Sequence, residues 1–405
     1  MKTRPDHTPA PHQPAARSRP SAVIVTTTFP ARPGDGTPEF VLTLASSIPG
    51  YDVTVIAPRM PGAAGEAVHD GVRVRRVAYF PRRWEGLATD AIMPTLRAAP
   101  WRVVEAPFLV AALLLATVRE VRRRRASVLN AHWIVPGGLI GLVVRALTRV
   151  PVVVTVHGAD AYTMRGRAGR WLKARVLRRA AAVLPVSRDI ARTLQLGDDV
   201  PVLRMGVDTA AIRAAVGDRA PVPGQLVYIG RLADKKGVDV LVDAVARCEG
   251  ARLDVLGDGP ERAALEARAA AAGVAERVRF HGKVPRSQVL AALARAQVVV
   301  IPSRVGADGD MEGTPVVLCE AMAAGVPVVA SRVGGLAECI HDGVDGILVE
   351  PDDVDDLAAA IDKALSGGID LDALGRAAAE EAGRSLDIGA VGAAYARIFD
   401  EVGGA

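Results

Sequence analysis

The chain has 405 residues, enough for two domains with separate cores. Half of its residues are hydrophobic and 23% are charged, which excludes a predominantly disordered chain. The net charge of +5 conceals an asymmetry: residues 1–205 hold 30 Lys and Arg against 14 Asp and Glu, whereas residues 206–405 hold 20 against 31. A net of +16 beside a net of −11 predicts two domains with different partners, the basic one facing an anionic surface or a phosphorylated substrate. A general bias toward arginine explains the asymmetry equally well.

Cysteine usage and the first residues indicate a cellular compartment. Cys248, Cys319 and Cys339 show no metal-ligand spacing and fit a reduced, cytoplasmic protein. Residues 1–20 are rich in Pro, His, Ala and Arg and lack an apolar stretch. We therefore expect a disordered tail there and no signal peptide.

Short apolar runs alternate with helical patterns along the whole chain. The first series predicts strands at 22–28, 53–57, 128–131, 152–156 and 182–185, with helices at 38–47, 108–124, 136–147 and 170–179. The second series, after the Pro- and Gly-containing stretch 221–224, predicts strands at 225–229, 252–256, 278–280, 298–301, 328–330 and 346–349, with helices at 238–247, 260–272, 286–294, 315–323, 336–340 and 354–365.

Two successive series of this kind predict an α/β protein with two doubly wound parallel sheets. We expect Rossmann-like domains at 21–205 and 206–384, facing each other across a cleft. Ligands bind such sheets at the carboxyl ends of the strands, so the site should lie in that cleft. Residues 385–405 should form a terminal helix that can dock on either domain, including back on the N-terminal one.

One apolar segment of the first domain has two interpretations. Residues 103–118 are apolar apart from Glu105, Pro107 and Thr117, and four arginines follow at 122–125. Sixteen residues with an early carboxylate and proline are short for a transmembrane helix. The segment is either a buried helix with a solvated basic end or an interfacial helix resting on an anionic membrane surface.

Polar groups follow several strands of the first domain. His132-Trp133 follows one strand, and His157-Gly158-Ala159-Asp160 follows the next. A lone histidine is usually structural, but His157 stands beside a glycine where a ligand can approach closely. After the first strand, the loop 33–37 offers the backbone N–H groups of Gly36 and Thr37 to a phosphate.

The first strand of the second domain leads directly into a basic turn. Residues 230–237 place Arg231 and Lys236 at the carboxyl end of this strand, just before a helix. Two fixed cations there can neutralise a diphosphate and the charge that develops as it leaves. A solvated basic turn is the alternative interpretation of this motif alone.

Glu312 and Glu320 flank the most informative stretch of the chain. Pro315 disfavours helical torsions at Thr314 and suits a first helical position, so Thr314 is predicted to be the N-cap. Glu312 then lies in a loop before a helix, and Glu320 projects from its second turn. Free N–H groups between the two carboxylates can hold phosphate. The spacing indicates a sugar joined to a phosphate, with Glu312 on the sugar.

Taken together, these motifs resemble the glycosyltransferase family 4 enzymes of GT-B fold over roughly residues 22–400. The most specific part is 312–335, and Gly230-Arg231-Leu232, Lys236-Gly237 and His157-Gly158 support it. The resemblance implies retaining transfer of a hexosyl unit from a nucleoside-diphosphate sugar to a hydroxyl of a glycan or lipid-linked acceptor. It further implies that no cofactor or metal is essential and that nucleic acid is not a partner. The implied role is cytoplasmic, in cell-surface polysaccharide or glycolipid synthesis. If residues 103–118 form an interfacial helix, the enzyme works on the inner face of the membrane.

The same resemblance assigns roles to individual residues. Arg231, Lys236, Glu312 and His157 form the catalytic group. The donor site adds the ribose contact Glu320, the nucleobase neighbours Lys283 and Val284, the stretch Gly313, Thr314, Pro315 and Val316, and Gly36 and Thr37. His132, Trp133 and Asp160 are expected on the acceptor side. The leaving phosphate takes the acceptor's proton, so no protein nucleophile is required.

Some residues depart from the family pattern, and other functions were weighed. Met205 replaces the usual Asn before Gly206-Val207-Asp208, and Gly313-Thr314-Pro315 replaces a common Gly-Phe-Gly. Asp308-Gly309-Asp310 resembles the DxD metal ligands of another glycosyltransferase architecture, but turn chemistry in a glycine-rich loop explains it better. A glycosidase with Glu312 and Glu320 as acid and base is disfavoured, because it leaves the cations without a role. A non-catalytic nucleotide-sugar-binding protein is the main alternative.

Overall fold

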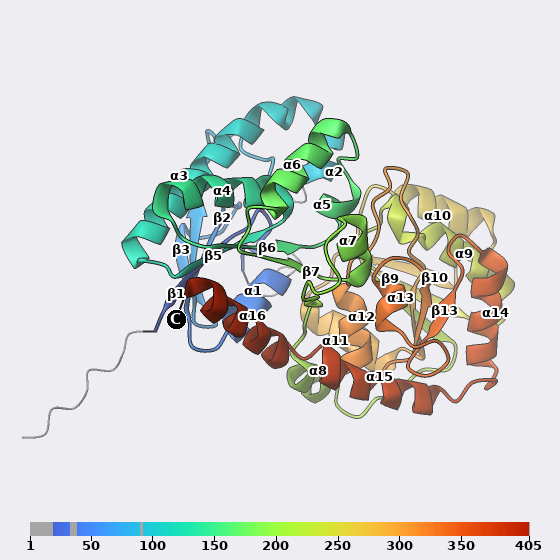
Figure 1. The fold of residues 1–405 in the computed structure, drawn as a ribbon. Helices are drawn as coiled ribbons and strands as arrows, with labels where there is room; N and C mark the ends of the chain where they lie inside the picture. The colour runs from blue at the N-terminus through green and yellow to red at the C-terminus, as the bar shows by residue number, and fades with distance from the viewer. Residues whose placement is uncertain (1–18, 33–38, 90–91, 405) are drawn as a thin grey trace, which may run out of the picture.

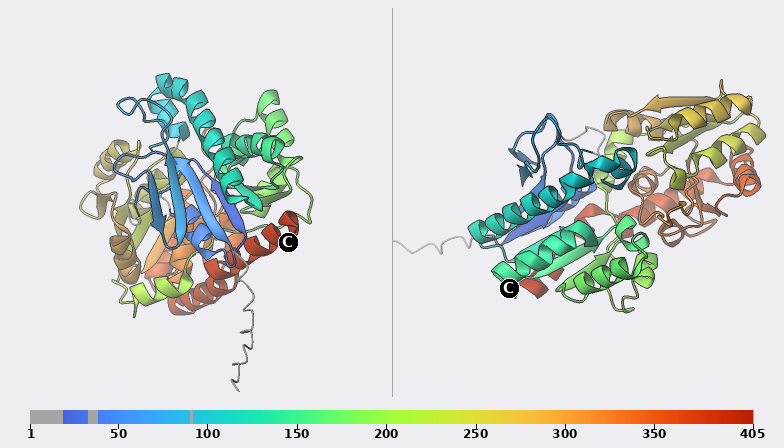
Figure 2. Two further views of the ribbon diagram at one scale, coloured as in Figure 1. Left: turned by 90° about the vertical axis from the view of Figure 1, so that its left-hand side faces the viewer. Right: turned by 90° about the horizontal axis from the view of Figure 1, so that it is seen from above.

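The computed structural model describes residues 19–32, 39–89 and 92–404, folded into two α/β units that lie side by side (Figures 1 and 2). The loop containing Gly36 and Thr37 and nearly all of the expected tail 1–20 lie outside the described residues. The expected architecture, two Rossmann-like domains with predominantly parallel sheets, is confirmed.

The first sheet has seven strands in the order β3-β4-β2-β1-β5-β6-β7, and all neighbours are parallel except β3 and β4. Its central strands are buried on both faces, as parallel strands with helices on either side require. The strands are β1 Ser21–Val25, β2 Asp52–Pro58, β3 Glu66–His69, β4 Val72–Val77, β5 Val128–His132, β6 Val152–Val156 and β7 Ala182–Pro185.

The second sheet has six parallel strands in the order β10-β9-β8-β11-β12-β13. The order reverses direction between β8 and β11, and such a switch point is where open α/β sheets bind ligands. The strands are β8 Gln225–Ile229, β9 Arg252–Leu256, β10 Val278–Gly282, β11 Val298–Ile301, β12 Val328–Ser331 and β13 Ile347–Val349.

Helices connect the strands of both sheets. In the first unit they are α1 Phe40–Ser47, α2 Ile92–Ala98, η1 Pro100–Glu105, α3 Ala106–Arg124, η2 Ile134–Gly138, α4 Leu139–Thr148, α5 Ala159–Tyr162, α6 Arg167–Leu177 and α7 Arg188–Thr193. In the second they are α8 Thr209–Val216, η3 Asp234–Lys236, α9 Val238–Arg247, α10 Arg262–Ala271, α11 Arg286–Arg295, α12 Val316–Ala323, α13 Leu336–Cys339, α14 Val354–Leu365 and α15 Leu371–Ser385.

The last helix, α16 (Ile388–Gly403), leaves the second unit and runs under the first, beside α1 (Figure 1). Its buried side chains Tyr395 and Phe399 join the core formed by β1, β2 and α1. Two polar contacts add to this packing: the Tyr51 hydroxyl donates to Asp400 Oδ1 at 2.6 Å, and the hydroxyls of Thr155 and Tyr395 lie 3.1 Å apart. The helix therefore completes the core of the N-terminal unit.

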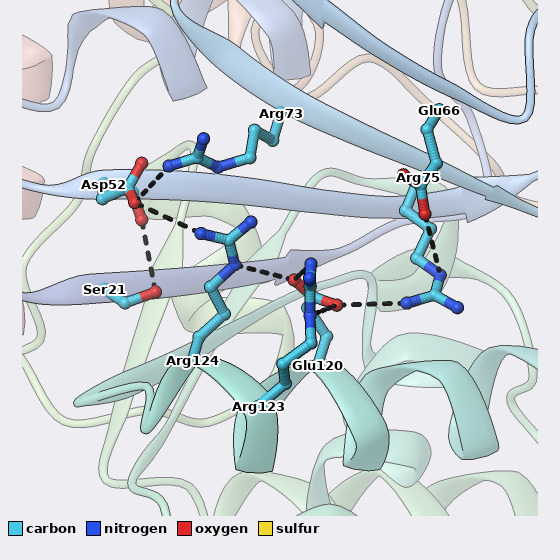
Figure 3. Close-up of polar contacts among 8 residues, drawn as sticks. All are labelled: Ser21, Asp52, Glu66, Arg73, Arg75, Glu120, Arg123 and Arg124. Atoms are coloured by element: carbon cyan, nitrogen blue, oxygen red, sulfur yellow. Dashed lines mark hydrogen bonds and ion pairs between the residues drawn. The ribbon is translucent and has the colours of Figure 1, made fainter.

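The helix pair η1–α3, spanning Pro100–Arg124, is long and apolar enough to cross a membrane by length and composition alone. It packs, however, against α4 and strands β1 and β2 as one layer of the first unit. Its basic end is anchored by Glu120, a fully buried carboxylate that accepts from Arg75, Arg123 and Arg124 (Figure 3). Burial would raise the pKa of Glu120, but the arginines outweigh burial and lower it.

Candidate active site

The turns that follow four adjacent strands meet at one edge of the second sheet. Because β10, β9, β8 and β11 are neighbours and parallel, the turns beginning at Lys283, Gly257, Gly230 and Pro302 all emerge on the same side. Gly237 lets η3 approach the β11 turn closely, since a Cβ there would lie 1.9 Å from the Pro302 carbonyl oxygen. The sequence-predicted cations and Glu312 are thereby brought together.

Glu312 lies at the centre of this edge and is 7% exposed. Its Oε1 is 3.0 Å from Lys236 Nζ and 3.6 Å from Lys235 Nζ. Burial would raise the pKa of this carboxyl, but Lys236 and Lys235 outweigh burial and hold the pKa at about 2. Both ammonium groups therefore lie within ion-pair distance of the same oxygen. Glu312 is thus an ionised hydrogen-bond acceptor at this edge.

Lys235 belongs to the same cluster, although the sequence analysis did not select it. Its Nζ is 2.9 Å from Asp310 Oδ2 as well as within reach of Glu312. Burial lowers the pKa of Lys235, but the negative charges of Glu312 and Asp310 have the larger effect, so the pKa is raised overall. The adjacent lysines Lys235 and Lys236 were the only sequence signal for this residue, and two neighbouring lysines do not indicate which of them contacts the glutamate.

Helix α12 begins as Pro315 predicts, but its capping differs from the expectation. Pro315 itself is the N-cap, and its carbonyl accepts from the backbone N–H of Leu318. The prediction that Thr314 caps the helix with its hydroxyl is wrong: Thr314 Oγ1 donates to the Val186 carbonyl of the first unit at 2.7 Å. In the part of the chain that the structure describes, no acceptor faces the N–H groups of Val316 and Val317, so they are available to an anion.

Glu320 lies one to two turns further into α12 and is 6% exposed. Arg286, the first residue of α11, donates to Glu320 Oε1. Burial raises the pKa of Glu320 despite the opposing charge of Arg286. The two glutamates thus differ electrostatically, because Glu312 has a depressed pKa and Glu320 a raised one.

The first unit contributes a cluster of rings at the ends of β5 and β6. His132 Nδ1 lies 2.8 Å from His157 Nε2, and the two rings stack with centroids 5.0 Å apart. Trp133 and Phe40 pack against His157, with centroids 4.8 and 5.0 Å away. Burial lowers the pKa of His157 to about 3 and that of His132 well below its ordinary value. Both rings are therefore neutral at pH 7.

Asp160 holds the two histidine turns together. Its carboxylate accepts backbone N–H groups from Ile134 at 2.8 Å, Gly158 at 3.1 Å and His157 at 3.3 Å. The side chain is buried, and burial raises its pKa in spite of these donors. Asp160 was expected beside the acceptor, and the structure gives its oxygens to loop backbone instead.

The remaining predicted donor residues lie around the same edge. Arg231 is partly buried, and its carbonyl accepts from the Tyr228 hydroxyl at 3.0 Å. Lys283 is exposed in the turn after β10, while Val284 packs against the core of the second unit. Gly36 and Thr37 lie outside the described residues, so their expected contacts remain a prediction.

The two units touch where the glutamate loop meets the histidine turn. A Cβ on Gly313 would lie 2.3 Å from the His157 carbonyl oxygen, so only glycine allows this approach. Nearby, the Glu338 carboxylate accepts the backbone N–H groups of Arg188 and Asp189 at the start of α7. These contacts place the His157 turn of the first unit against the loop of the second unit that contains Glu312.

Neither aspartate of the Asp308-Gly309-Asp310 turn is arranged as a metal ligand. Asp308 pairs with Arg97 of the first unit, Asp310 pairs with Lys235, and Asp308 Oδ1 accepts the backbone N–H of Asp310 at 3.0 Å. Across 19–32, 39–89 and 92–404, no group of three or more His, Cys, Asp or Glu side chains is placed to hold a metal ion.

Solved structures with the same architecture define the fold. Sucrose-phosphate synthase from Thermosynechococcus elongatus aligns with a TM-score of 0.73 at 20% identity, covering 95% of this chain and 99% of that one. Anabaena HepE in complex with UDP aligns with a TM-score of 0.69 at 18% identity, covering 94% and 100%. The fold is that of the GT-B glycosyltransferases.

Sequence comparison gives the family. Residues 218–381 match the model described as "Glycosyl transferases group 1", and residues 43–207 match "Glycosyl transferase 4-like domain". The chain is 29% identical to glycogen synthase of Mycobacterium tuberculosis over 386 residues, 88% of each chain. It is 30% identical to the GDP-mannose-dependent phosphatidylinositol monomannoside mannosyltransferase of Mycolicibacterium smegmatis over 365 residues, 85% of this chain and 89% of the relative. The chain belongs to the family 4 glycosyltransferases and is an enzyme of that class.

Proposed function

We propose that this glycosyltransferase moves a hexosyl unit from a nucleoside-diphosphate sugar to a hydroxyl of a glycan or lipid-linked acceptor, with retention of configuration, in cell-surface polysaccharide or glycolipid synthesis. The observation that carries the proposal is the buried cluster of Glu312, Lys235 and Lys236 at the start of α12. A buried ionised carboxylate, cations and free helix N–H groups suit a sugar linked to phosphate.

Lys236, Arg231 and the start of α12 form the proposed diphosphate subsite. Lys236 Nζ lies 3.0 Å from Glu312 Oε1, and the free N–H groups of Val316 and Val317 follow Glu312 by four and five residues. When the diphosphate binds, Lys236 turns to it, and Lys235 continues to neutralise Glu312. Cations fixed in this way favour the negative charge that develops on the leaving diphosphate.

Glu312 and His157 are proposed to hold the sugar from opposite walls. Ionised Glu312 accepts from sugar hydroxyls, and His157 orients the sugar or the attacking acceptor. The low pKa of His157 makes its ring a poor base at pH 7, which supports a positioning role. The acceptor's proton then passes to the leaving phosphate, as the family resemblance implies. Glu320 is proposed to bind the ribose hydroxyls.

The biological setting rests on the relatives. They include mycobacterial mannosyltransferases that act on a phosphatidylinositol monomannoside and a putative colanic acid biosynthesis glycosyltransferase of Escherichia coli, 32% identical over 246 residues. These names support a carbohydrate polymer or glycolipid as product. A cytoplasmic enzyme that works at the inner face of the membrane is part of the same proposal.

A surface of the first unit supports contact with an anionic membrane. Along η1–α3, Val104, Phe108 and Leu115 are 53, 54 and 69% exposed and recur on one helix face that continues into exposed Arg119 and Arg122. Beside it, α4 exposes Val143 and Leu147. An apolar stripe that ends in arginines is typical of helices resting on anionic lipid.

The activity test measures release of nucleoside diphosphate from UDP-, GDP- and ADP-sugars with glycan and lipid-linked acceptors. The matched variants are Glu312→Gln, Lys236→Ala and the exposed control Lys363→Ala. We expect each site variant to lose at least about 100-fold in kcat/KM, because charged contacts to the transition state are removed, while the control keeps wild-type rates. An unchanged rate in both site variants refutes the assigned site, and NMR of the product anomer tests retention.

The membrane test measures sedimentation with anionic and neutral vesicles at low and high salt. We expect binding to anionic vesicles that weakens with salt and falls in Leu115→Glu. The control Val344→Glu changes an equally exposed valine of the second unit. Equal binding to neutral vesicles, or no loss in Leu115→Glu, contradicts this surface.

A further inference from the structure

The loop from residue 304 to 312 crosses the junction between the units and is held at several points. Arg304 binds Asp234, Asp239 and Asp352 in the second unit. The Gly306 N–H donates to the Asp310 carbonyl at 2.8 Å, which closes a tight turn. This bonding fixes where the side chain of Asp310 projects.

The first unit holds the same loop from the other side. Arg165 donates to the Gly309 carbonyl at 3.1 Å, and Arg97 pairs with Asp308. Two residues after Gly309, the carbonyl oxygen of Met311 would lie 3.5 Å from a Cβ built on Gly158 of the first unit. Asp310 therefore lies in the wall where the histidine turn and the glutamate loop meet.

Asp310 and Glu312 share one cation. Lys235 Nζ lies 2.9 Å from Asp310 Oδ2 and 3.6 Å from Glu312 Oε1, so the two carboxylates face the same point. Asp310 Oδ1 is buried and has no hydrogen-bond donor among the described residues, whereas Glu312 Oε1 is paired with Lys236 and Lys235. A buried carboxylate oxygen without a donor is costly, so a ligand donor is the expected partner.

We propose that Asp310 is a specificity-determining residue that, beside Glu312, accepts a hydrogen bond from one hydroxyl of the donor sugar. This inference rests on the proposed function. Sugar hydroxyls are the donors that two adjacent carboxylates recognise, whereas the negative charge of Asp310 repels the diphosphate. Lys235 keeps both carboxylates oriented when Lys236 engages the phosphate. The site therefore favours a neutral hexose with a free hydroxyl at the position that Asp310 reads.

The experiment compares Asp310→Asn with Asp308→Asn, a matched change in the same turn that retains the side-chain oxygen accepting the Asp310 N–H. For the donor selected by the nucleotide-sugar screen, kcat/KM is measured with the natural sugar and with its 2-, 3-, 4- and 6-deoxy analogues. Binding of the corresponding nucleoside diphosphate, without sugar, is measured by calorimetry. Thermal unfolding checks that both variants are folded.

We expect Asp310→Asn to lose about 10- to 100-fold in kcat/KM, the range for a hydrogen bond to a charged group, with nucleoside-diphosphate affinity within about twofold of wild type. The wild type should have a low kcat/KM with one of the deoxy analogues, the one that lacks the hydroxyl bound by Asp310. With that analogue Asp310→Asn should lower kcat/KM little further, because the same hydrogen bond is already missing. Asp308→Asn should change neither quantity by more than about twofold.

Two results overturn the inference. The first is an Asp310→Asn variant that keeps wild-type kcat/KM, or that loses nucleoside-diphosphate affinity as much as sugar-donor activity. The second is an equal response of Asp310→Asn to all four deoxy analogues, which marks a purely structural role. Failure of the wild type to use any nucleotide sugar is a different outcome, because it refutes the proposed function itself.

Discussion

Replacing Glu312 by Gln removes one buried charge while keeping the shape of the side chain, and its effect on stability should depend on pH. In the folded protein the pKa of Glu312 is about 2, against 4.5 for an unperturbed glutamate. A pKa that folding depresses contributes stability above the unfolded value and loses it as pH falls through the folded value. Glu312 therefore stabilises the protein at pH 7 and ceases to do so between about pH 4.5 and 2.

The size of the effect follows from the two pKa values. At about 1.4 kcal/mol for each pH unit between them, the ionised form contributes about 3 kcal/mol at neutral pH. By the same linkage, about 1 kcal/mol of it is lost at pH 4 and about 2 kcal/mol at pH 3. The difference in unfolding free energy between wild type and Glu312→Gln should narrow by these amounts.

Urea unfolding of both proteins at pH 7, 4 and 3 measures this difference. Glu266→Gln serves as the control, because Glu266 is a half-exposed partner of Arg262 and its replacement should give a nearly constant difference. The free energies of unfolding of wild type and Glu312→Gln could instead differ by a constant amount from pH 7 to 3. That result would show that the two lysines do not stabilise the carboxylate, and the electrostatic account of the site would fail.

Three other substitutions test separate parts of the structure. Glu320→Gln should weaken UDP or GDP binding about tenfold in calorimetry by losing charge-assisted bonds to the ribose, and an unchanged affinity contradicts that role. Gly313→Ala, which puts a Cβ 2.3 Å from a carbonyl oxygen of the opposite unit, should lower kcat about 100-fold. The control Gly197→Ala has open space around it and should leave kcat unchanged. Equal effects of the two substitutions would refute the close-contact argument. Phe399→Ala should cost about 3–5 kcal/mol in urea unfolding, and a loss below about 1 kcal/mol contradicts the packing of α16.

Most of the sheet architecture was predictable because buried parallel strands leave a strong apolar signal. The six strands of the second sheet lie within two residues of their predicted positions. In the first sheet β3 and β4 were missed, since β3 is a half-exposed edge strand with weak hydrophobicity. The alternation of buried Val72 and Val74 with exposed Arg73 was a signal for β4 that periodicity could have found.

Helix prediction was less complete where helices are short or rich in alanine. Helix α15 was missed although Asp370 caps it by accepting the N–H of Ala373, which is a recognisable start signal. The helices α5 and α7 have only four and six residues, too few to show a periodic pattern. Tertiary contacts rather than local sequence determine such short elements.

The sequence predicted that the strand-end residues gather at one edge, but it predicted neither their bonding nor the presence of Lys235 among them. Strand-end positions brought His132 and His157 onto neighbouring strands and Arg231, Lys236 and Glu312 to one edge. The hydroxyl of Thr314 was assigned to its own helix, but it bonds to the other unit, a contact between residues 128 positions apart in sequence. The pairing of Lys235 with Asp310 likewise depends on the path of an irregular loop, which no periodicity encodes.

The position of α16 has a consequence for how the chain folds during synthesis. The face of the first sheet near β1 and α1 is covered by side chains as late as Phe399, so this core stays partly open until the ribosome has made nearly the entire second unit. The first unit must therefore wait, with apolar surface exposed, for a helix that begins 363 residues after the end of its first strand (Val25 to Ile388). Closure of this core and attachment of the second unit to the first thereby depend on the same late helix.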